Sequence, residues 1–280
     1  MRKFTTIAVG ILWFFTLYCG ISHAASTGIA DSSHDLSRGS QGSESSKFMY
    51  ATSQTCVFCH TPHGANTSVK SDSFVEASTG FYNAGTGSPL LLWNRAIVNA
   101  DTPDFELYAS STSVPVTQVR VHSLLCLSCH DGVGALNVVQ NFPADGVDRE
   151  AEFGAIDWYQ FGKPIGQRPN QIGDTWDNGI NIGGRTPLNG QTFVELRDDH
   201  PISVNYDAAY AQDNNGMVLK TTAGGVEYVG DPKLKLYSGY VECSTCHDPH
   251  NEGEASTGFK YPFLWVDNAG SNLCLQCHNK

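Results

Sequence analysis

The chain has 280 residues, with 28 acidic and 17 basic side chains and a formal net charge of −11 at pH 7. This acidic balance argues against nucleic acid or an anionic membrane as a partner, because both carry negative charge themselves. Glycine is abundant, at 28 residues, and long helical periodicity is absent, which argues against a bundle of long helices.

The first 24 residues have the pattern of a secretory signal peptide. Arg2 and Lys3 precede an apolar run from Phe4 to Ile21, and Ser22-His23-Ala24 is a small-x-small cleavage pattern. We expect cleavage after residue 24, which discards Cys19 and leaves a charge of 15 − 28 = −13. No later segment approaches the roughly 18 consecutive apolar residues of a spanning helix. The sequence therefore predicts a secreted protein with no membrane span.

One pattern, Cys-x-x-Cys-His, occurs four times, at Cys56–His60, Cys126–His130, Cys243–His247 and Cys274–His278. It is the attachment pattern of a c-type haem, in which two thiols bond the porphyrin and the histidine ligates the iron. The predicted attachment residues are Cys56, Cys59, Cys126, Cys129, Cys243, Cys246, Cys274 and Cys277. All cysteines that remain after cleavage lie in these motifs, so none is left for a disulfide.

Cys-x-x-Cys pairs also suit structural zinc sites, which are the alternative interpretation. Zinc does not require a histidine directly after every second cysteine, and export from the cytoplasm favours haem attachment. The sequence therefore predicts four covalently bound haem c groups.

The predicted fold is mostly irregular and loop-rich, with short helices and a few short strands wrapped around four haems. We infer that the macrocycles form much of the core. Residues 25–140 are expected to form the leader and the first di-haem module, with a Gly/Ser/Asn-rich loop at 64–88. Leu90–Trp93 is apolar and is expected to pack on a porphyrin. Alternating valines at 112–121 predict a strand that leads into the second motif.

Residues 141–240 contain no attachment motif and are expected to form a haem-free insertion that supplies a distal ligand. Met217–Leu219 and Val226–Val229 flank a turn at Ala223-Gly224-Gly225 and predict a hairpin. Lys233–Tyr237 alternates polar and apolar residues in the same way. Residues 241–280 form the second di-haem module.

The two modules repeat each other in sequence. Both contain Cys-x-x-Cys-His-x-Pro-His, then Glu-Ala-Ser-Thr-Gly-Phe, then Leu-Cys-Leu-x-Cys-His. These strings lie at 56–63, 76–81 and 125–130 in the first module, and at 243–250, 254–259 and 273–278 in the second.

Histidines are numerous enough to ligate every iron on both faces. The proximal ligands are His60, His130, His247 and His278. The distal candidates are His34, His63, His200 and His250. His122 lies four residues before Cys126 and is expected to be the spare imidazole. Met49 and Met217 could also serve as axial ligands, but enough histidines exist without them.

His63 cannot ligate the far face of the haem that His60 holds. Three residues span at most about 10 Å when fully extended, too little to pass round a porphyrin edge. Pro62 also forces Thr61 out of helical geometry and turns the chain away. We therefore expect His63, and likewise His250 after Pro249, to ligate a neighbouring haem, which forces macrocycles into close pairs.

These motifs, together with Ser33-His34-Asp35 and Asp199-His200-Pro201, resemble the doubled-CXXCH multihaem cytochromes of metal-reducing bacteria, especially the tetrahaem extracellular members. The resemblance runs from His34 to the C-terminus but leaves out the loops at 64–88 and 141–195. It implies low-spin bis-histidine haems and subunits that polymerise into filaments which conduct electrons outside the cell. In such filaments one distal histidine can come from the neighbouring subunit, and we expect His34, on the polar leader, to have that role.

The favoured interpretation is electron transfer without substrate chemistry. The expected partners are redox proteins, an extracellular electron acceptor and further copies of the chain, at the cell surface or beyond it. Two alternatives stay open: a monomeric periplasmic or surface shuttle, and a multihaem reductase with an open iron position. The histidine count does not require any iron to be open.

Overall fold

The fold is given by a computed structural model. It describes residues 28–30, 32, 34–37, 54–90, 92–97, 104–108, 114–130, 139–141, 184–188, 191–197, 199–251 and 263–279. The predicted signal peptide, residues 142–183 of the predicted insertion and the repeat string at 254–259 lie outside these residues. Within them, no helix is both long enough and apolar enough to cross a membrane.

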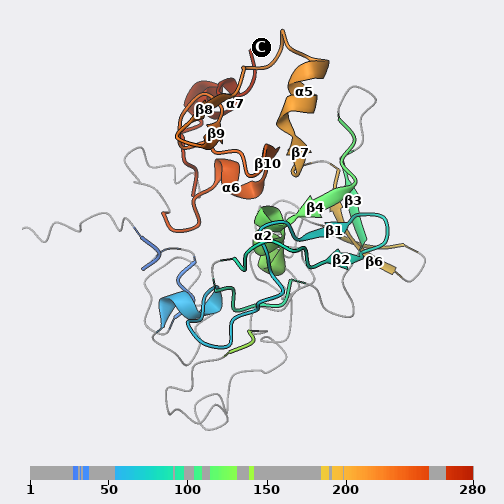
Figure 1. Ribbon diagram of the computed structural model, residues 1–280, viewed down its shortest axis with the longest axis vertical. Helices are drawn as coiled ribbons and strands as arrows, with labels where there is room; N and C mark the ends of the chain where they lie inside the picture. Colours follow the sequence, from blue (N-terminus) through green and yellow to red (C-terminus); the bar gives the residue numbers. More distant parts are fainter. Residues whose placement is uncertain are drawn as a thin grey trace, which may run out of the picture.

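Short helical turns hold all four Cys-x-x-Cys-His motifs (Figure 1). These are η1 (Thr55–Phe58), α2 (Val121–His130), α6 (Cys243–Cys246) and α7 (Asn272–Leu275). A helical turn places residues i and i+3 on one face, so both cysteines of a motif point the same way. In three motifs the histidine amide donates to the carbonyl of the first cysteine, at 2.8 Å for His60 and 3.0 Å for both His247 and His278. The other helical elements are α5 (Tyr206–Gln212) and η3 (Ala269–Ser271).

The strands are short and form four small sheets. One has the order β2-β1-β4 and another β3-β6-β5, while β7 pairs with β10 and β8 with β9. All pairs are antiparallel except β3 with β6. The strands are β1 (Phe74–Glu76), β2 (Tyr82–Asn83), β3 (Asp104–Leu107), β4 (Gln118–Arg120), β5 (Gly184–Leu188), β6 (Gln191–Leu196), β7 (Val204–Asn205), β8 (Thr221–Ala223), β9 (Val226–Tyr228) and β10 (Tyr240–Val241). The described part of the chain is therefore loop-rich, with short helices and strands.

The strand predicted at 112–121 is shorter than expected and turns directly into a helix. Pairing with β1 covers only Gln118–Arg120, and α2 begins at Val121. Residues 112 and 113 lie outside the described part.

The predicted hairpin is present, but its first strand was placed too early. Ala223 pairs with Val226, so Gly224 (φ 59°) and Gly225 (φ 80°) form a two-residue turn between β8 and β9. Two positive φ angles suit the turn that matches strand twist, and this turn fixes the partner of β9 as Thr221–Ala223. Met217, which the prediction placed in that strand, instead bridges to His278.

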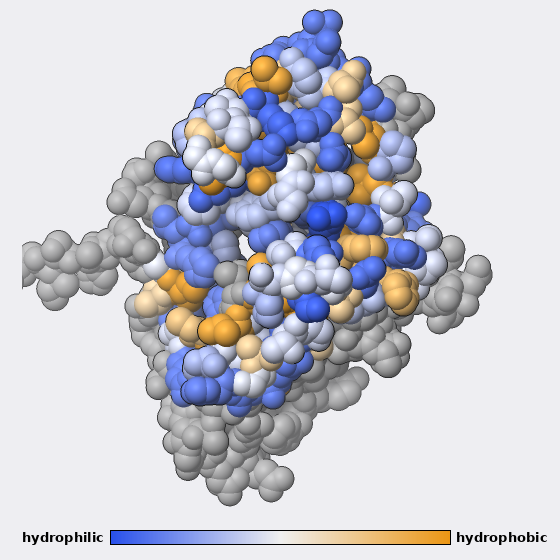
Figure 2. Space-filling view, viewed as in Figure 1, coloured by the Kyte–Doolittle hydropathy of each residue, from blue (hydrophilic) through white to orange (hydrophobic). Residues whose placement is uncertain are grey.

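Apolar burial is divided among small clusters rather than one core. Helix α2 contributes to two of them from neighbouring faces. The first comprises Val75, Ala77, Phe105, Val119, Leu124, Leu127 and Leu196, and the second Val69, Trp93, Val121 and Leu125. A third cluster contains Tyr206, Val229 and Leu236. The described surface in Figure 2 is correspondingly mixed, with small apolar patches among polar residues.

A short bridge holds the proximal histidine of the first motif. His60 pairs with Trp93 as an isolated antiparallel bridge. Two backbone bonds flank it, from Thr61 N to Leu92 O at 2.9 Å and from Asn94 N to Cys59 O at 2.8 Å.

The third motif repeats this bridge residue for residue. His247 pairs with Leu264, and the flanking bonds run from Asp248 N to Phe263 O and from Trp265 N to Cys246 O. The residue before each bridge partner is left-handed, Leu92 with φ 50° and Phe263 with φ 59°. A non-glycine residue rarely adopts this conformation, so its recurrence at the same position shows that the sequence repeat is also a structural repeat.

The sequence repeat provides two equivalent leucines, one buried and one exposed, whose contributions to stability can be compared. Leu127 and Leu275 occupy the same place in Leu-Cys-Leu-x-Cys-His, but Leu127 is 2% exposed and Leu275 is 47% exposed. Leu127→Ala should lower the free energy of unfolding by about 2–5 kcal/mol, because it leaves a cavity in a packed cluster. Leu275→Ala should change it by about 0.5 kcal/mol or less. Denaturant unfolding of the mature protein measures both, and equal losses would contradict the assignment of α2 to the core.

Candidate haem sites

We number the motifs in chain order: site 1 at Cys56–His60, site 2 at Cys126–His130, site 3 at Cys243–His247 and site 4 at Cys274–His278. All eight of their cysteines carry free thiols. Burial raises the pKa of Cys59 and Cys246 to about 12 and that of Cys277 to about 11. Among the described residues, no three His, Cys, Asp or Glu side chains are grouped as a bare metal ion would need.

Sulfur atoms of successive sites are neighbours. Cys59 of site 1 lies close enough to Cys129 of site 2 for their charges to interact. The thiols of Cys126 of site 2 and Cys243 of site 3 lie close enough for each to shift the pKa of the other. Cys246 of site 3 interacts electrostatically with Cys277 of site 4. The four attachment sites therefore follow one another in space in the same order as in the sequence.

Whether the histidines fit a haem iron can be tested from the spacing of their rings. A metal–imidazole bond is about 2 Å long, and the ligating nitrogen lies about 1.1 Å from the ring centroid, so two imidazoles on opposite faces of one iron have centroids roughly 6 Å apart.

Three pairs of histidines have this spacing. The ring centroids are 6.0 Å apart for His34 and His130, 6.2 Å for His60 and His250, and 6.5 Å for His200 and His278. Each pair joins one predicted distal histidine to one proximal histidine. The residues present at sites 1, 2 and 4 therefore fit a haem ligated on both faces.

Two distal candidates have their tautomer fixed by a backbone carbonyl. His34 Nδ1 lies 3.2 Å from Pro249 O, and His200 Nδ1 lies 3.0 Å from Pro201 O. A carbonyl can only accept, so Nδ1 must carry the proton and Nε2 keeps its lone pair. This is the arrangement by which outer-shell partners orient a metal-binding imidazole.

The leader that carries His34 is packed against the rest of the chain. The His34 ring stacks on Phe263 with centroids 4.2 Å apart. Asp35 is 4% exposed, and its carboxylate accepts from the backbone amide of Ser37 at 3.1 Å. The His34 ring also lies beside His130 of its own chain, with the ring centroids 6.0 Å apart.

His63 is exposed and is fixed through its backbone. Its carbonyl accepts from Thr61 Oγ1 at 2.8 Å and from Asn141 Nδ2 at 2.7 Å. Fully buried Asn94 holds Asn141 in turn, donating to its carbonyl at 2.9 Å and accepting from its amide at 2.8 Å. The segment after site 1 thus has a defined course, although the sequence prediction did not include Asn94 or Asn141.

His122 contacts an aromatic residue rather than a proximal histidine. Its ring centroid lies 4.0 Å from that of Tyr237. Burial, followed by the nearby Arg120, lowers the pKa of His122 to about 4. The ring is therefore neutral at pH 7. Of the apolar run predicted to pack on a porphyrin, Trp93 is buried beside His60, whereas Leu92 is 57% exposed.

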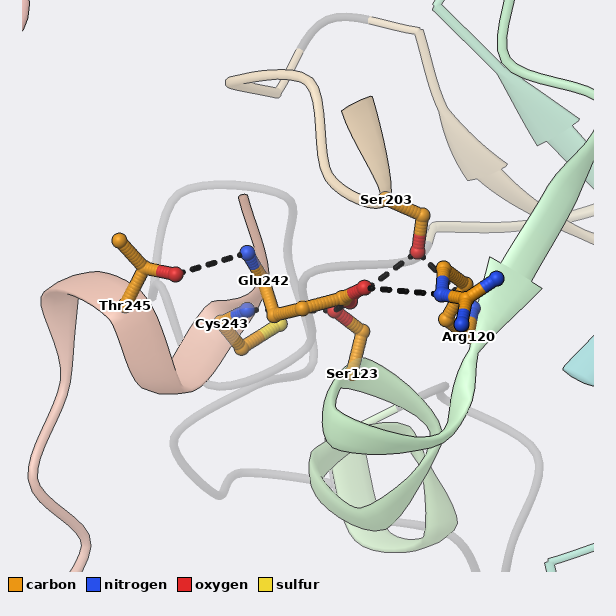
Figure 3. Close-up of polar contacts among 6 residues, drawn as sticks. All are labelled: Arg120, Ser123, Ser203, Glu242, Cys243 and Thr245. Atoms are coloured by element: carbon orange, nitrogen blue, oxygen red, sulfur yellow. Dashed lines mark hydrogen bonds and ion pairs between the residues drawn. The ribbon is translucent and has the colours of Figure 1, made fainter. Parts of the chain in front are cut away.

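A buried polar cluster between sites 2 and 3 was not predicted from the sequence (Figure 3). Its centre is Glu242, which directly precedes Cys243 and is 2% exposed. Its carboxylate accepts from Ser123 Oγ at 2.5 Å and from Ser203 Oγ at 3.1 Å. Burial raises the pKa of Glu242 to about 7, although both serines and Arg120 act to lower it. The only sequence signal was an acidic residue next to an attachment cysteine.

Comparison with known proteins bears on the second module. Residues 238–280 match the family model of the doubled CXXCH motif. The match contains sites 3 and 4 and covers less than half of the chain. No curated protein matches the chain. The doubled motif implies covalently bound haem c and indicates a haem-binding electron-transfer cytochrome.

The raised pKa of Glu242 predicts a pH dependence of stability. Between about pH 4.5 and 7 the folded state binds more protons at this carboxyl than the unfolded state does, so stability falls as pH rises through this range. Glu242→Gln removes this loss, and the variant should gain about 3 kcal/mol relative to the parent protein across the range. Denaturant unfolding of both mature proteins at several pH values measures the difference. A difference that does not change with pH would contradict the shifted pKa.

Proposed function

We propose that this chain is a tetrahaem c-type cytochrome, which carries electrons along closely packed bis-histidine haems and self-associates into an extracellular conductive filament. The observation that carries the first part is the spacing of three histidine pairs at 6.0, 6.2 and 6.5 Å. Unrelated surface histidines have no reason to recur at the distance that separates trans ligands of one iron.

The proposed ligand pairs are His60 with His250, His130 with His34, and His278 with His200. His63 then remains for His247. The symmetry of the two motifs supports this assignment. His250 lies three residues after His247 of site 3, and its ring is near His60 of site 1. By the same spacing, His63 lies three residues after His60 and would ligate the haem of site 3. Sites 1 and 3 would each hold the distal ligand of the other.

Haem c supplies reversible one-electron chemistry when bound. In this proposal the chain supplies two imidazoles per site, and backbone carbonyls set the tautomer of His34 and His200. Four distal candidates for four sites leave no position that must be filled by water or substrate. This supports electron transfer rather than an enzyme.

The finer resemblance is to the tetrahaem, filament-forming extracellular cytochrome OmcE, and it supports self-association and a location at or outside the cell surface. The partners would be redox proteins, an extracellular acceptor and further copies of the chain. The acidic surface, with a net charge of −11 for the whole sequence, would favour a basic patch on a redox partner.

Removing one distal histidine should open one iron. In His250→Ala, we expect the mature protein to keep four haems but to bind CO at about one haem after reduction, because six-coordinate bis-histidine haem resists CO. His122→Ala is the matched control, since its ring packs on Tyr237. Absorption spectra under CO and a pyridine haemochrome count measure both variants. CO binding by the parent protein would instead support the reductase alternative, and no CO binding by His250→Ala would exclude this ligand pair.

Negative-stain electron microscopy of the secreted, haem-loaded protein tests the filament. Uniform filaments are expected. In addition, because His34 lies beside His130 of its own chain, His34→Ala should open site 2 to CO in dissociated subunits as well as in filaments. Small discrete particles of the parent protein at all concentrations would instead identify a diffusing shuttle.

A further inference from the structure

Sites 2 and 3 belong to different modules, yet their attachment helices meet directly. The Cys126 and Cys243 thiols lie close enough for each to shift the pKa of the other. The amide of Cys243 donates to Ser123 Oγ at 3.1 Å, which joins the first residue of α6 to α2. Cys126 and Cys243 would each hold one haem by a thioether bond, so this contact lies between two attachment sites.

Glu242 links α2, the segment before β7 and the α6 turn by hydrogen bonds (Figure 3). One carboxylate oxygen, Oε2, accepts both from Ser123 on α2 and from Ser203 before β7. The backbone amide of Glu242 donates to Thr245 Oγ1 at 3.0 Å, inside the turn that carries Cys243 and Cys246. A single buried side chain thus joins three segments that are far apart in sequence.

Arg120, the last residue of β4, also contacts this buried polar cluster. Its amide donates to Ser203 Oγ at 2.9 Å, and its Nε lies 4.0 Å from Glu242 Oε1. Its guanidinium lies over the Tyr240 ring, 4.2 Å from the centroid. Glu242 Oε1 itself is buried and has no hydrogen-bond partner. The charge of Glu242 also acts to raise the pKa of Tyr237 and that of Cys243.

Stability does not explain a carboxyl group at this place. A buried carboxylate with one oxygen unpaired costs free energy, and a neutral side chain of the same shape would serve stability at least as well. What the side chain provides, as a carboxyl or as an amide of the same shape, is one oxygen that accepts from two serines of different segments beside the contact between two attachment helices.

We propose that Glu242 is a positioning residue, which holds sites 2 and 3 at the separation and angle that allow an electron to cross between the two di-haem modules. This rests on the proposed electron-transfer function. Glu242 acts through Ser123 and the α6 turn, and it touches neither haem iron nor any histidine ligand.

The test compares four variants of the full mature protein. Glu242→Ala removes the shared acceptor, whereas Glu242→Gln keeps an amide oxygen that can accept from both serines and removes only the charge. Ser123→Ala removes the link to Cys243 from the opposite side. Glu227→Ala is the control, because Glu227 lies in β9 and accepts from Lys220 Nζ at 2.7 Å.

Two readouts separate positioning from general stability. Each protein is first required to contain four low-spin haems, by pyridine haemochrome count and mass. The split Soret circular-dichroism signal of coupled haems and the midpoint potentials from spectroelectrochemistry are then compared with the parent. We expect Glu242→Ala and Ser123→Ala to lose the part of the split signal that sites 2 and 3 contribute and to shift the potentials, while Glu242→Gln and Glu227→Ala keep the parent signal.

The outcomes are distinguishable. A parent protein without four low-spin haems would refute the proposed function itself. If the parent has them, an unchanged Soret signal in Glu242→Ala would overturn the positioning role, as would a loss in Glu242→Gln equal to that in Glu242→Ala, because charge rather than position would then be responsible. If Glu242→Ala does not mature, Ser123→Ala decides by the same criterion.

Discussion

The proposed arrangement of the haem sites depends on how far the chain can extend between two histidines of one motif. A histidine three residues beyond the proximal ligand cannot pass round the porphyrin that the same motif holds. In the proposed ligand scheme its iron would belong to another motif, and the chain would have to bring together two motifs that are far apart in sequence. The spacing of 6.2 Å between the ring centroids of His60 and His250 supports such a scheme. It joins the first module to the second across 190 residues of sequence.

Such a constraint works only if each motif is locally rigid, because an imidazole that swings cannot select one iron. The bridges from His60 to Trp93 and from His247 to Leu264 supply that rigidity. Each uses a left-handed residue to turn a second strand of chain back onto the proximal histidine. Rigidity here comes from backbone bonds and buried amides such as Asn94, since the described apolar clusters are small. Covalent haem attachment would add the same kind of restriction to the unfolded chain as a cross-link does.

Local features were predictable from sequence, and long-range ones only where chemistry left few choices. The helical turns at the motifs follow from i, i+3 spacing, and the Gly224-Gly225 turn was found although the strand before it was misplaced. Counting histidines gave the candidates for distal ligands, but it could not show where each ring lies, because nothing local indicates that the His34 ring would stack on Phe263. The Glu242 cluster was beyond prediction for the same reason. Ser123 and Ser203 lie 119 and 39 residues away from Glu242 in sequence, and the local sequence around each serine does not indicate a buried partner.

The order of the four sites and the exposure of their cysteines are consistent with the proposed path for electrons. Sulfur contacts link site 1 to site 2, site 2 to site 3, and site 3 to site 4. The two exposed attachment cysteines are Cys56 and Cys274, at the two ends of that series, whereas the cysteines of sites 2 and 3 are partly covered. Electrons that enter and leave such a row must do so where a haem edge reaches solvent or a partner, and its middle must be shielded and held in fixed geometry. Glu242 lies at that middle, between two modules that share no continuous secondary structure, and this is where a fixed geometry is hardest to maintain by local bonds alone.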